Sequence, residues 1–302
     1  MTETTSTVFH RYCLLGDESP DTILISTDEV HFYVHRKQIM GASDSLWAGL
    51  LISSPESLPS SSLHVTEYAP TLEIILRSIY RLSLEDYSAT LETVLAAINA
   101  MKMHGISLKS HISPGMPLFN ALVDKLPSAP LEVYCVAAEN DLFELACEAS
   151  KYLLHMSMSS VTDVIALRLG HLYLRMLFDL LSERTRILQR LVIQPPPQHP
   201  PTALCGSDEY RGLQSAWSKM ACTPILSGGP DTSVEMLRAT FNSDNFLNSC
   251  PTCVQFINRH VEDVLSRWST TPNTICRNPM DFRVALPSQQ VTPQLDISSA
   301  MV

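Results

Sequence analysis

The spacing of apolar residues in the first fifty positions predicts a β-hairpin followed by helices. A short apolar run at residues 23–25 is flanked by Ser and Thr, which favours a buried strand. The Asp-Glu pair at 28–29 is typical of a tight turn, and the β-forming residues 32–34 predict the returning strand. From His35 the apolar period lengthens to that of a helix, and Ser43 is placed as the N-cap of the next helix.

One further strand and a series of amphipathic helices are expected next. Residues 63–65 form a short apolar run that predicts the strand, and Pro70 opens a helix because proline suits the first helical turn. In this helix and the following one, apolar positions recur every three or four residues. They are Leu72, Ile75, Leu76, Ile79 and Leu82, then Leu91, Val94, Leu95, Ile98 and Met101. From residue 114 to residue 193 the pattern predicts helices only, including a short one at 161–167 and a long one at 169–192.

A proline-rich run interrupts the helical pattern at residues 194–201. Such a run favours an extended polyproline conformation, so it is interpreted as a semi-rigid linker, with a ligand for a peptide-binding partner as the alternative. Three helices are expected beyond it, at 210–222, 233–246 and 253–268. Residues 271–302 lack periodicity and are interrupted by prolines, which predicts a disordered tail.

The opening segment resembles the start of a BTB (POZ) domain. The family signature is an Asp before an apolar strand, then Phe-x-Val-His-Lys, an apolar pair, and a Ser that begins the next helix. The matching residues are Asp21, Phe32, Val34, His35, Ile39, Met40 and Ser43, with Arg36 in place of the usual Lys, Leu46 in place of Phe and Gly49 in place of Met. The resemblance implies an α+β fold over residues 16–113, in which helices cap a small mixed sheet.

A second resemblance concerns the helices that follow. Ile79 and Tyr80 match the Ile-Tyr end of one family helix, and Met103 with the Ala-Ala pair at 96–97 keeps part of the next. Residues 130–138 resemble the all-α extension that follows the BTB domain in proteins of mushroom-forming (basidiomycete) fungi. The expected organisation is a leader at 1–15, a BTB domain at 16–113, a helical extension at 114–193, a linker at 194–201, a C-terminal helical region at 202–270 and a tail at 271–302.

The resemblance implies a non-enzymatic protein–protein interaction module, acting as an adaptor or scaffold. BTB domains offer a helix-and-strand surface to a second copy of themselves or to another protein. Some members recruit a cullin-type ubiquitin ligase and others recruit a transcriptional corepressor, and both alternatives stay open for this chain. The resemblance also implies that His35, Ile39 and Leu50 are buried where the first helices meet the sheet.

The apolar residues of the leader have two possible positions. They are Val8, Phe9, Tyr12 and Leu14. Because exposed apolar groups at this density often mark a contact surface, one expectation is a homodimer in which the leader reaches a second copy. The alternative is that the leader folds back on its own domain as an edge strand.

Composition and charge disfavour several classes of partner for this chain. Of the 302 residues, 45% are hydrophobic and 17% are charged, which is typical of a folded protein. The net charge of −10 disfavours nucleic acid as a partner, since that partner usually needs a basic face. No stretch is long and apolar enough to span a bilayer, and the first residues lack a signal-peptide pattern. We therefore expect an intracellular protein of the cytoplasm or nucleus, with no membrane and no small-molecule substrate as partners.

No catalytic template is matched. Residues 228–230, Gly-Gly-Pro, lack the Lys-Ser/Thr of a phosphate-binding loop and predict a turn. Residues 41–45 lack the closing Gly of a nucleophile elbow. His31 and His35 lie four apart without the Glu of a zinc-protease helix, and His35 is interpreted as a structural residue at the sheet edge. No catalytic or cofactor-binding residue is therefore assigned, and the chain is not expected to be an enzyme.

One cysteine constellation has the character of a metal site. Cys250 and Cys253 form a C-x-x-C pair that can hold one edge of a zinc tetrahedron, with further ligands from Cys205 or Cys222 upstream. His260 lies seven residues downstream of the pair. In a zinc site the sulfurs would lie about 3.5–4 Å apart. The alternatives are a redox pair and ordinary packing of small apolar side chains. The remaining cysteines, Cys13, Cys135, Cys147 and Cys276, have no partner spacing and are expected in the core or tail.

Two rival functions from other classes concern residues 205–270. A cryptic enzyme there would need a pocket lined by a Cys, a His and a carboxylate. A zinc-stabilised region that binds nucleic acid is the other rival, and the acidic balance of the chain disfavours it.

Overall fold

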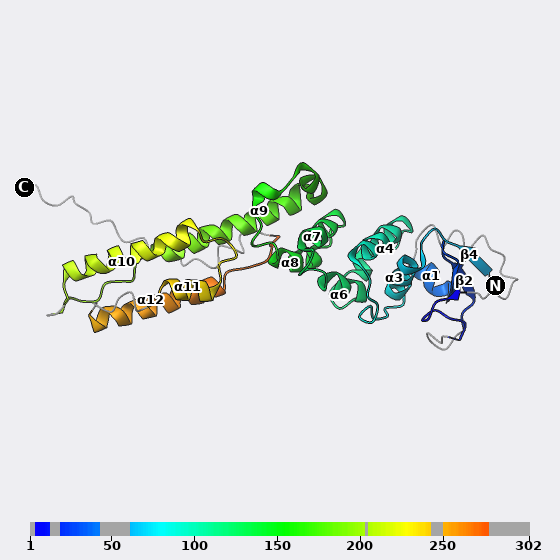
Figure 1. Cartoon of the computed structure of the whole chain (residues 1–302), viewed down its shortest axis with the longest axis horizontal. Helices are drawn as coiled ribbons and strands as arrows, with labels where there is room; N and C mark the ends of the chain where they lie inside the picture. The colour runs from blue at the N-terminus through cyan, green and yellow to red at the C-terminus, as the bar shows by residue number, and fades with distance from the viewer. Residues whose placement is uncertain (1–3, 13–18, 43–60, 203–204, 243–249, 278–302) are drawn as a thin grey trace, which may run out of the picture. The chain divides into compact units, whose positions relative to one another are not determined.

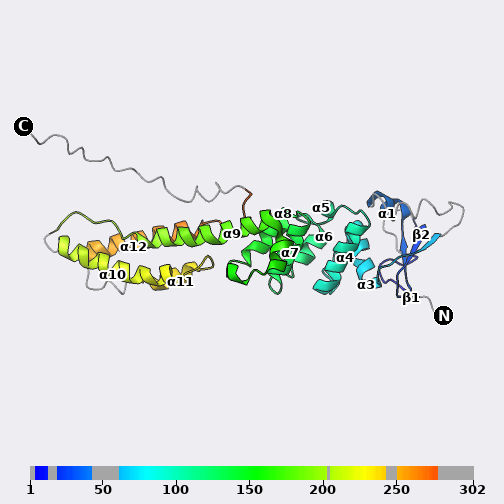
Figure 2. The same cartoon turned by 90° about the horizontal axis from the view of Figure 1, so that it is seen from above.

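The computed structural model describes residues 4–12, 19–42, 61–202, 205–242 and 250–277. Over these residues the protein is α+β, with eleven α-helices and one four-stranded sheet, so the α+β part of the expectation is confirmed (Figures 1 and 2). Contacts divide the chain into two units, Met1–Leu153 with Ser159–Leu174, and Leu154–Met158 with Arg175–Val302. This division differs from the domain boundaries expected from the sequence, because one long helix, α9, contributes residues to both units.

The sheet of the first unit is built around the predicted hairpin. Its strands are β1 Thr4–Thr5, β2 Thr22–Ile25, β3 Val30–Val34 and β4 Ser61–His64, in the order β1-β3-β2-β4. β2 and β3 are antiparallel, whereas β1 pairs with β3 and β4 pairs with β2 in parallel. Glu29 adopts a φ of 60° in the turn, and the Asp28 carboxylate accepts a 2.8 Å hydrogen bond from the Ala69 backbone N–H. The hairpin turn therefore also positions the start of the next long helix, α3.

Helices cover the rest of the first unit. They are α1 Arg36–Ala42, α3 Ala69–Ile79, α4 Leu91–Met103, α5 Leu108–His111, α6 Pro117–Val123, α7 Pro130–Glu139 and α8 Phe143–Lys151, followed by a 3-10 turn at Met158–Ser160. Proline occupies the first turn of α3, α6 and α7. A backbone N–H in the first turn has no acceptor within the helix, so the N–H that proline lacks costs no hydrogen bond there. The helices predicted within the described residues of this region are therefore present, with ends displaced by a few residues, whereas the helix expected after Ser43 lies outside them.

The segment at residues 21–42 is held by hydrogen bonds within itself and to Tyr80. The Asp21 carboxylate accepts a 2.7 Å hydrogen bond from the Arg36 backbone N–H at the start of α1. His35 is buried, its backbone N–H donates to the Tyr80 hydroxyl at 2.8 Å, and its Nδ1 lies 3.0 Å from the same oxygen. Ile39 is fully buried. The expected burial of His35 and Ile39 is confirmed, whereas Leu50 and the expected N-cap Ser43 lie outside the described residues.

The leader folds back on its own domain. β1 extends the sheet, the Ser6 N–H donates to the His31 carbonyl at 3.0 Å, and Phe9 is fully buried, with its ring 5.4 Å from that of Tyr80. Tyr12 is 83% exposed. Phe9 is therefore buried in its own domain, whereas the dimer expectation assumed that the apolar residues of the leader are exposed. Leu14 lies outside the described residues.

Helix α9, Asp163–Ile193, contains a kink at Gly170, where φ is 63° and ψ is 172°. Only glycine adopts this left-handed region without strain, so the predicted boundary between a short helix and a long one is confirmed at this residue. Before the kink, Arg168 forms a two-point ion pair with Glu132 at 2.7 and 2.8 Å and a third bond to Glu139 at 2.5 Å. These bonds attach the first part of α9 to α7.

The second unit packs the later part of α9 against α10 Ser207–Leu226, α11 Val234–Thr240 and α12 Pro251–Ser269. Trp217 lies at its centre, stacked on Phe241 with ring centroids 4.5 Å apart and donating to the Val192 carbonyl at 2.9 Å. The buried residues of this core are Ile187, Leu188, Leu191, Val192, Cys205, Leu213, Trp217, Ala221, Leu237, Phe241, Cys253, Ile257, Val261, Val264, Leu265 and Trp268.

Two segments that were expected to be unpacked lie against this unit. Within the proline-rich run, Pro196 and His199 are buried, so the run is not simply a spacer. At the start of the expected disordered tail, Thr271 and Ile275 are buried. The expectation of disorder is wrong for these tail residues, because the end of α12 is fastened to α9. Residues 278–302 lie outside the description.

Candidate metal centre

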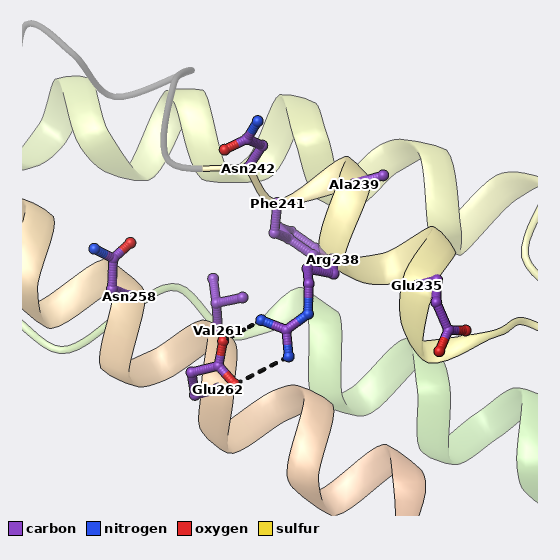
Figure 3. A pocket seen from close by; sticks show the side chains of 8 residues that line it. All are labelled: Glu235, Arg238, Ala239, Phe241, Asn242, Asn258, Val261 and Glu262. Atoms are coloured by element: carbon purple, nitrogen blue, oxygen red, sulfur yellow. Dashed lines mark hydrogen bonds and ion pairs between the residues drawn. The ribbon is translucent and has the colours of Figure 1, made fainter.

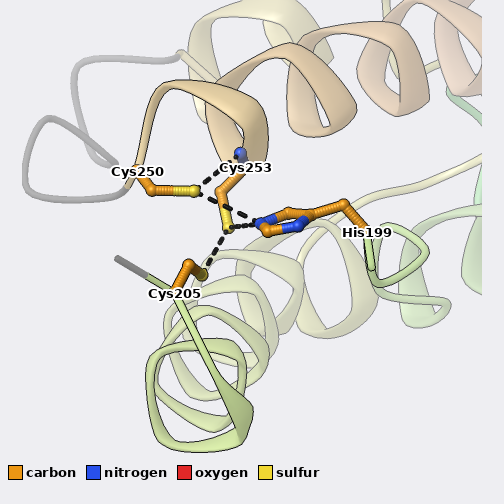
Figure 4. A group of neighbouring side chains, drawn as sticks. All are labelled: His199, Cys205, Cys250 and Cys253. Atoms are coloured by element: carbon orange, nitrogen blue, oxygen red, sulfur yellow. Dashed lines mark hydrogen bonds between the residues drawn. The ribbon is translucent and has the colours of Figure 1, made fainter. Parts of the chain in front are cut away.

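Three chain segments bring four metal-binding side chains together in the second unit (Figure 4). The proline-rich run supplies His199, and the turn before α10 supplies Cys205. Cys205 is positioned by two backbone hydrogen bonds that it exchanges with Thr202, of 3.0 and 3.2 Å. Cys250 is the N-cap of α12 and Cys253 lies in its first turn. Pro251 favours the helix start at this point, so the local sequence determines the position of the C-x-x-C pair.

The distances within the cluster match the requirements of a tetrahedral ion. The sulfurs of Cys205 and Cys253 lie 3.5 Å apart, and His199 Nε2 lies 3.3 Å from Cys250 Sγ and 3.2 Å from Cys253 Sγ. All four donor atoms lie within 4.8 Å of one another. A zinc ion with sulfur ligands at about 2.3 Å and nitrogen at about 2.0 Å needs donor–donor separations of about 3.5–3.8 Å. The four side chains can therefore hold a metal ion with small adjustments.

Hydrogen bonds with backbone groups orient the side chains of the candidate ligands. His199 Nδ1 lies 2.7 Å from the Pro200 carbonyl oxygen. Because that oxygen can only accept, Nδ1 carries the hydrogen and the lone pair of Nε2 faces the sulfurs of Cys250 and Cys253. Metal-binding histidines commonly donate their second ring N–H in this way. The Cys253 backbone N–H donates to Cys250 Sγ at 3.3 Å, which supports negative charge on that sulfur.

The three thiols differ in burial and, partly for that reason, in pKa. Cys205 and Cys253 are 4% exposed and Cys250 is half-buried. The bond from the Cys253 backbone lowers the pKa of Cys250 to about 7, whereas burial raises the pKa of Cys253 to about 12 and also raises that of Cys205. The Pro200 carbonyl raises the pKa of His199. Because a metal binds the deprotonated ligands, ion binding here would release protons and would strengthen as the pH rises.

The structure confirms one part of the cysteine prediction and corrects another. Cys250 and Cys253 converge with Cys205 as expected. Cys222 is exposed and belongs to no metal-binding cluster of the described residues, because α10 carries it several turns away from Cys205. His260 is not a ligand either, since its Nε2 lies 2.9 Å from the Gln194 carbonyl oxygen and its ring contacts Trp217.

His199 is the ligand that sequence reasoning missed. It stands inside a proline-rich run that was interpreted as a linker, and it lies six residues before Cys205. The available signal was this H-x5-C spacing upstream of a C-x-x-C pair, which is too irregular to identify a site without the fold.

Other candidates from the sequence occupy structural positions. His35 hydrogen-bonds to Tyr80, as expected of a structural residue, and His31 lies in β3. The Gly-Gly-Pro segment is a turn, in which the Gly229 N–H donates to the Thr232 hydroxyl at 3.0 Å. Cys135 is buried in α7, and burial raises the pKa of its thiol to about 11. Cys147 and Cys276 are half-buried, and Cys13 lies outside the described residues.

A groove of about 720 Å³ lies between α11 and α12 (Figure 3). Arg238 and Glu262 form an ion pair across it, and Phe241 and Val261 contribute apolar surface. Its described lining includes carboxylates but neither a cysteine nor a histidine. The groove therefore lacks the combination that the cryptic-enzyme alternative requires.

No model of a known protein family matches this chain, and no curated protein is significantly similar to it. None of the described helices has the length and apolar character needed to cross a membrane.

Proposed function

We propose that His199, Cys205, Cys250 and Cys253 hold a structural zinc ion that joins three segments of the second unit. The observation that carries this proposal is the convergence of four donors within 4.8 Å, from positions up to 54 residues apart in sequence. Three thiolates and an imidazole are a donor set that zinc prefers, and four protein ligands leave no open position for a substrate. The role is therefore structural. Thiolate ligation also requires reduced cysteines, so the proposal includes a reducing compartment, the cytoplasm or nucleus.

Metal analysis of protein purified without chelator tests the zinc site. We expect about one equivalent of zinc, as one closed four-ligand site requires. Replacement by Co²⁺ is expected to give the intense near-ultraviolet absorption of cobalt–thiolate bonds. Cys253→Ser should abolish both signals, whereas Cys222→Ser, a change at an exposed cysteine outside the cluster, should preserve them. A metal-free wild-type protein with a Cys250–Cys253 disulfide would contradict the zinc site and favour the redox pair.

We also propose that the first unit is a BTB-type interaction module without chemistry of its own. Contacts made by residues of the BTB-like signature support this proposal. The Asp21 carboxylate accepts a hydrogen bond from the first turn of α1, and His35 hydrogen-bonds to Tyr80. Tyr80 belongs to the Ile-Tyr pair that resembles the end of a BTB helix. A hairpin flanked by a third, parallel strand and followed by helices agrees with the small mixed sheet that the resemblance implies.

The partner in this proposal is a protein, either a second copy of the chain, a cullin or a transcriptional corepressor. Light scattering at micromolar concentration tests self-association, and titration with a purified cullin N-terminal region or a corepressor peptide tests the other two. Deleting the leader would remove the buried Phe9 and destabilise the domain, so Tyr12→Ala is the better variant for a leader-mediated dimer. A monomer that binds neither probe would contradict the interaction module.

A further inference from the structure

The proline-rich segment lies against the second unit along one edge. Pro196 and His199, three residues apart, are buried, whereas residues 197–198 and 200–201 are exposed. A polyproline II helix has three residues per turn, so positions three apart share an edge. The burial pattern therefore corresponds to one edge of such a helix against the protein and two edges in solvent.

Contacts with side chains hold this segment in place. The Tyr210 hydroxyl donates to the Pro196 carbonyl at 3.0 Å, and His260 Nε2 lies 2.9 Å from the Gln194 carbonyl oxygen. The His199 ring contacts Phe256 and enters the metal centre. Within the described part of the chain, no backbone group of residues 195–201 bonds to another backbone group. Because residues 195–201 have no such backbone bonds, the position of the segment depends on Tyr210, on His260 and on the metal ligand His199.

The exposed edge carries a recognition pattern. Pro197-Gln198-His199-Pro200 reads Pro-x-x-Pro, and its two prolines are three residues apart and both exposed. Aromatic-lined grooves bind prolines spaced in this way because the polyproline II conformation is preformed and loses little entropy on binding. The same residue that binds the metal, His199, occupies the opposite, buried edge.

We propose that this segment is a ligand for a polyproline-binding protein domain, presented on its Pro197 and Pro200 edge by the metal centre. The inference rests on the proposed zinc site for the anchoring of His199. Fixing the segment in its extended form before binding reduces the ordering cost of the complex. This proposal takes up the alternative that the sequence left open beside a linker, a ligand for a peptide-binding partner, and it adds a second interaction site to that of the first unit.

Binding of the zinc-loaded full chain to an array of purified SH3 and WW domains tests this proposal, with calorimetry on every domain that binds. We expect saturable binding that Pro197→Ala combined with Pro200→Ala weakens by about tenfold or more, since each 1.4 kcal/mol of lost contact is a factor of ten. Pro195→Ala, in the same run but outside the Pro-x-x-Pro pattern, should bind like the wild type. Absence of binding to every domain, or equal binding by the double variant, would overturn the proposal.

A second set of measurements distinguishes the Pro-x-x-Pro segment as a binding site from the metal centre that anchors it. Zinc content is measured in each sample, and the Pro197 and Pro200 variant should retain the wild-type value because neither side chain is a ligand. His199→Ala should weaken binding of the same domains through loss of anchoring, and unchanged binding would overturn presentation by the metal centre. A wild-type protein without zinc would instead contradict the zinc site, whatever its affinity for the domains.

Discussion

The guanidinium carbon of Arg184 lies 4.4 Å from the centre of the Trp268 ring. Its N–H groups donate to the carbonyl oxygens of Pro230 at 2.7 Å, Thr271 at 2.9 Å and Pro272 at 2.8 Å. Burial lowers the pKa of Arg184 to about 10, so the group stays charged at neutral pH. This charge lies at the C-terminal end of α12, where the helix dipole favours a cation. Arg184 therefore fastens one end of α12, and the metal centre lies at the other.

Arg184→Met is expected to destabilise the second unit by about 2–4 kcal/mol, because it leaves one buried and two partly buried carbonyl groups without their donor and removes the contact with Trp268. Arg186→Met changes an exposed neighbour on the same helix and should cost about 0.5 kcal/mol or less. Urea unfolding followed by tryptophan fluorescence measures both, since Trp217 and Trp268 lie in this unit. Equal midpoints for the two variants would contradict the anchoring role of Arg184.

Removal of the metal is expected to open the beginning of α12 before its end. A strong chelator should increase hydrogen exchange at the hydrogen-bonded N–H groups of Thr202 and Cys205 and in the first turns of α12. The end of α12 should stay protected, because Trp268 donates to the Thr232 carbonyl at 2.8 Å and contacts Arg184. Cys205→Ser should reproduce the pattern without chelator, whereas Cys222→Ser should not. Uniform loss of protection along α12 would show that the two ends are not anchored separately.

Glu67→Gln is expected to reduce the stability of the first unit and its sensitivity to acid. Glu67 is buried and its carboxylate lies 2.7 Å from His104 Nε2. Burial alone would raise the pKa of Glu67, but the hydrogen bond and charge of His104 together with the bond from Thr66 outweigh it, and the pKa lies below its usual value. A carboxylate with a lowered pKa contributes stability above its unfolded pKa of about 4.3, and that stability is lost as the pH falls through the folded value.

At pH 7 the loss from Glu67→Gln should be about 1–3 kcal/mol, as for a buried hydrogen bond to a charged group. The difference between variant and wild type should shrink below about pH 4. Hydrogen exchange of α3 and α4 as a function of pH measures this in the first unit. Glu85→Gln, at an exposed glutamate, is the matched control. A difference that is independent of pH would contradict the assignment to Glu67.

Phe9→Ala is expected to cost about 3–5 kcal/mol, as truncations of fully buried aromatic residues do. The Phe9 ring lies against Phe32 and Tyr80, so its loss leaves a cavity beside the sheet. Tyr12→Ala, three residues further along the leader, should change stability little because Tyr12 is exposed. Thermal unfolding of both variants checks the fold-back. A small effect of Phe9→Ala together with a monomer–dimer change would instead favour exchange of the leader between copies.

The sequence by itself determined the elements whose causes are local. The hairpin at 22–34 follows from β-forming runs around a polar turn, and α3, α6 and α7 begin where proline favours a first turn. The break near residue 170 follows from a single glycine. The C-x-x-C pair at the start of α12 was predictable for the same reason, since Pro251 and the N-cap Cys250 are adjacent in sequence.

Only the tertiary structure decided which distant residues meet. Cys205 and Cys222 were equivalent partners in the sequence, and the packing of α10 against α12 selects Cys205. His199 became a ligand, and Arg184 an anchor for residues 271–272, through contacts spanning 51 to 88 positions. No periodicity encodes such pairs, because they depend on how whole helices pack around Trp217 and not on neighbours along the chain.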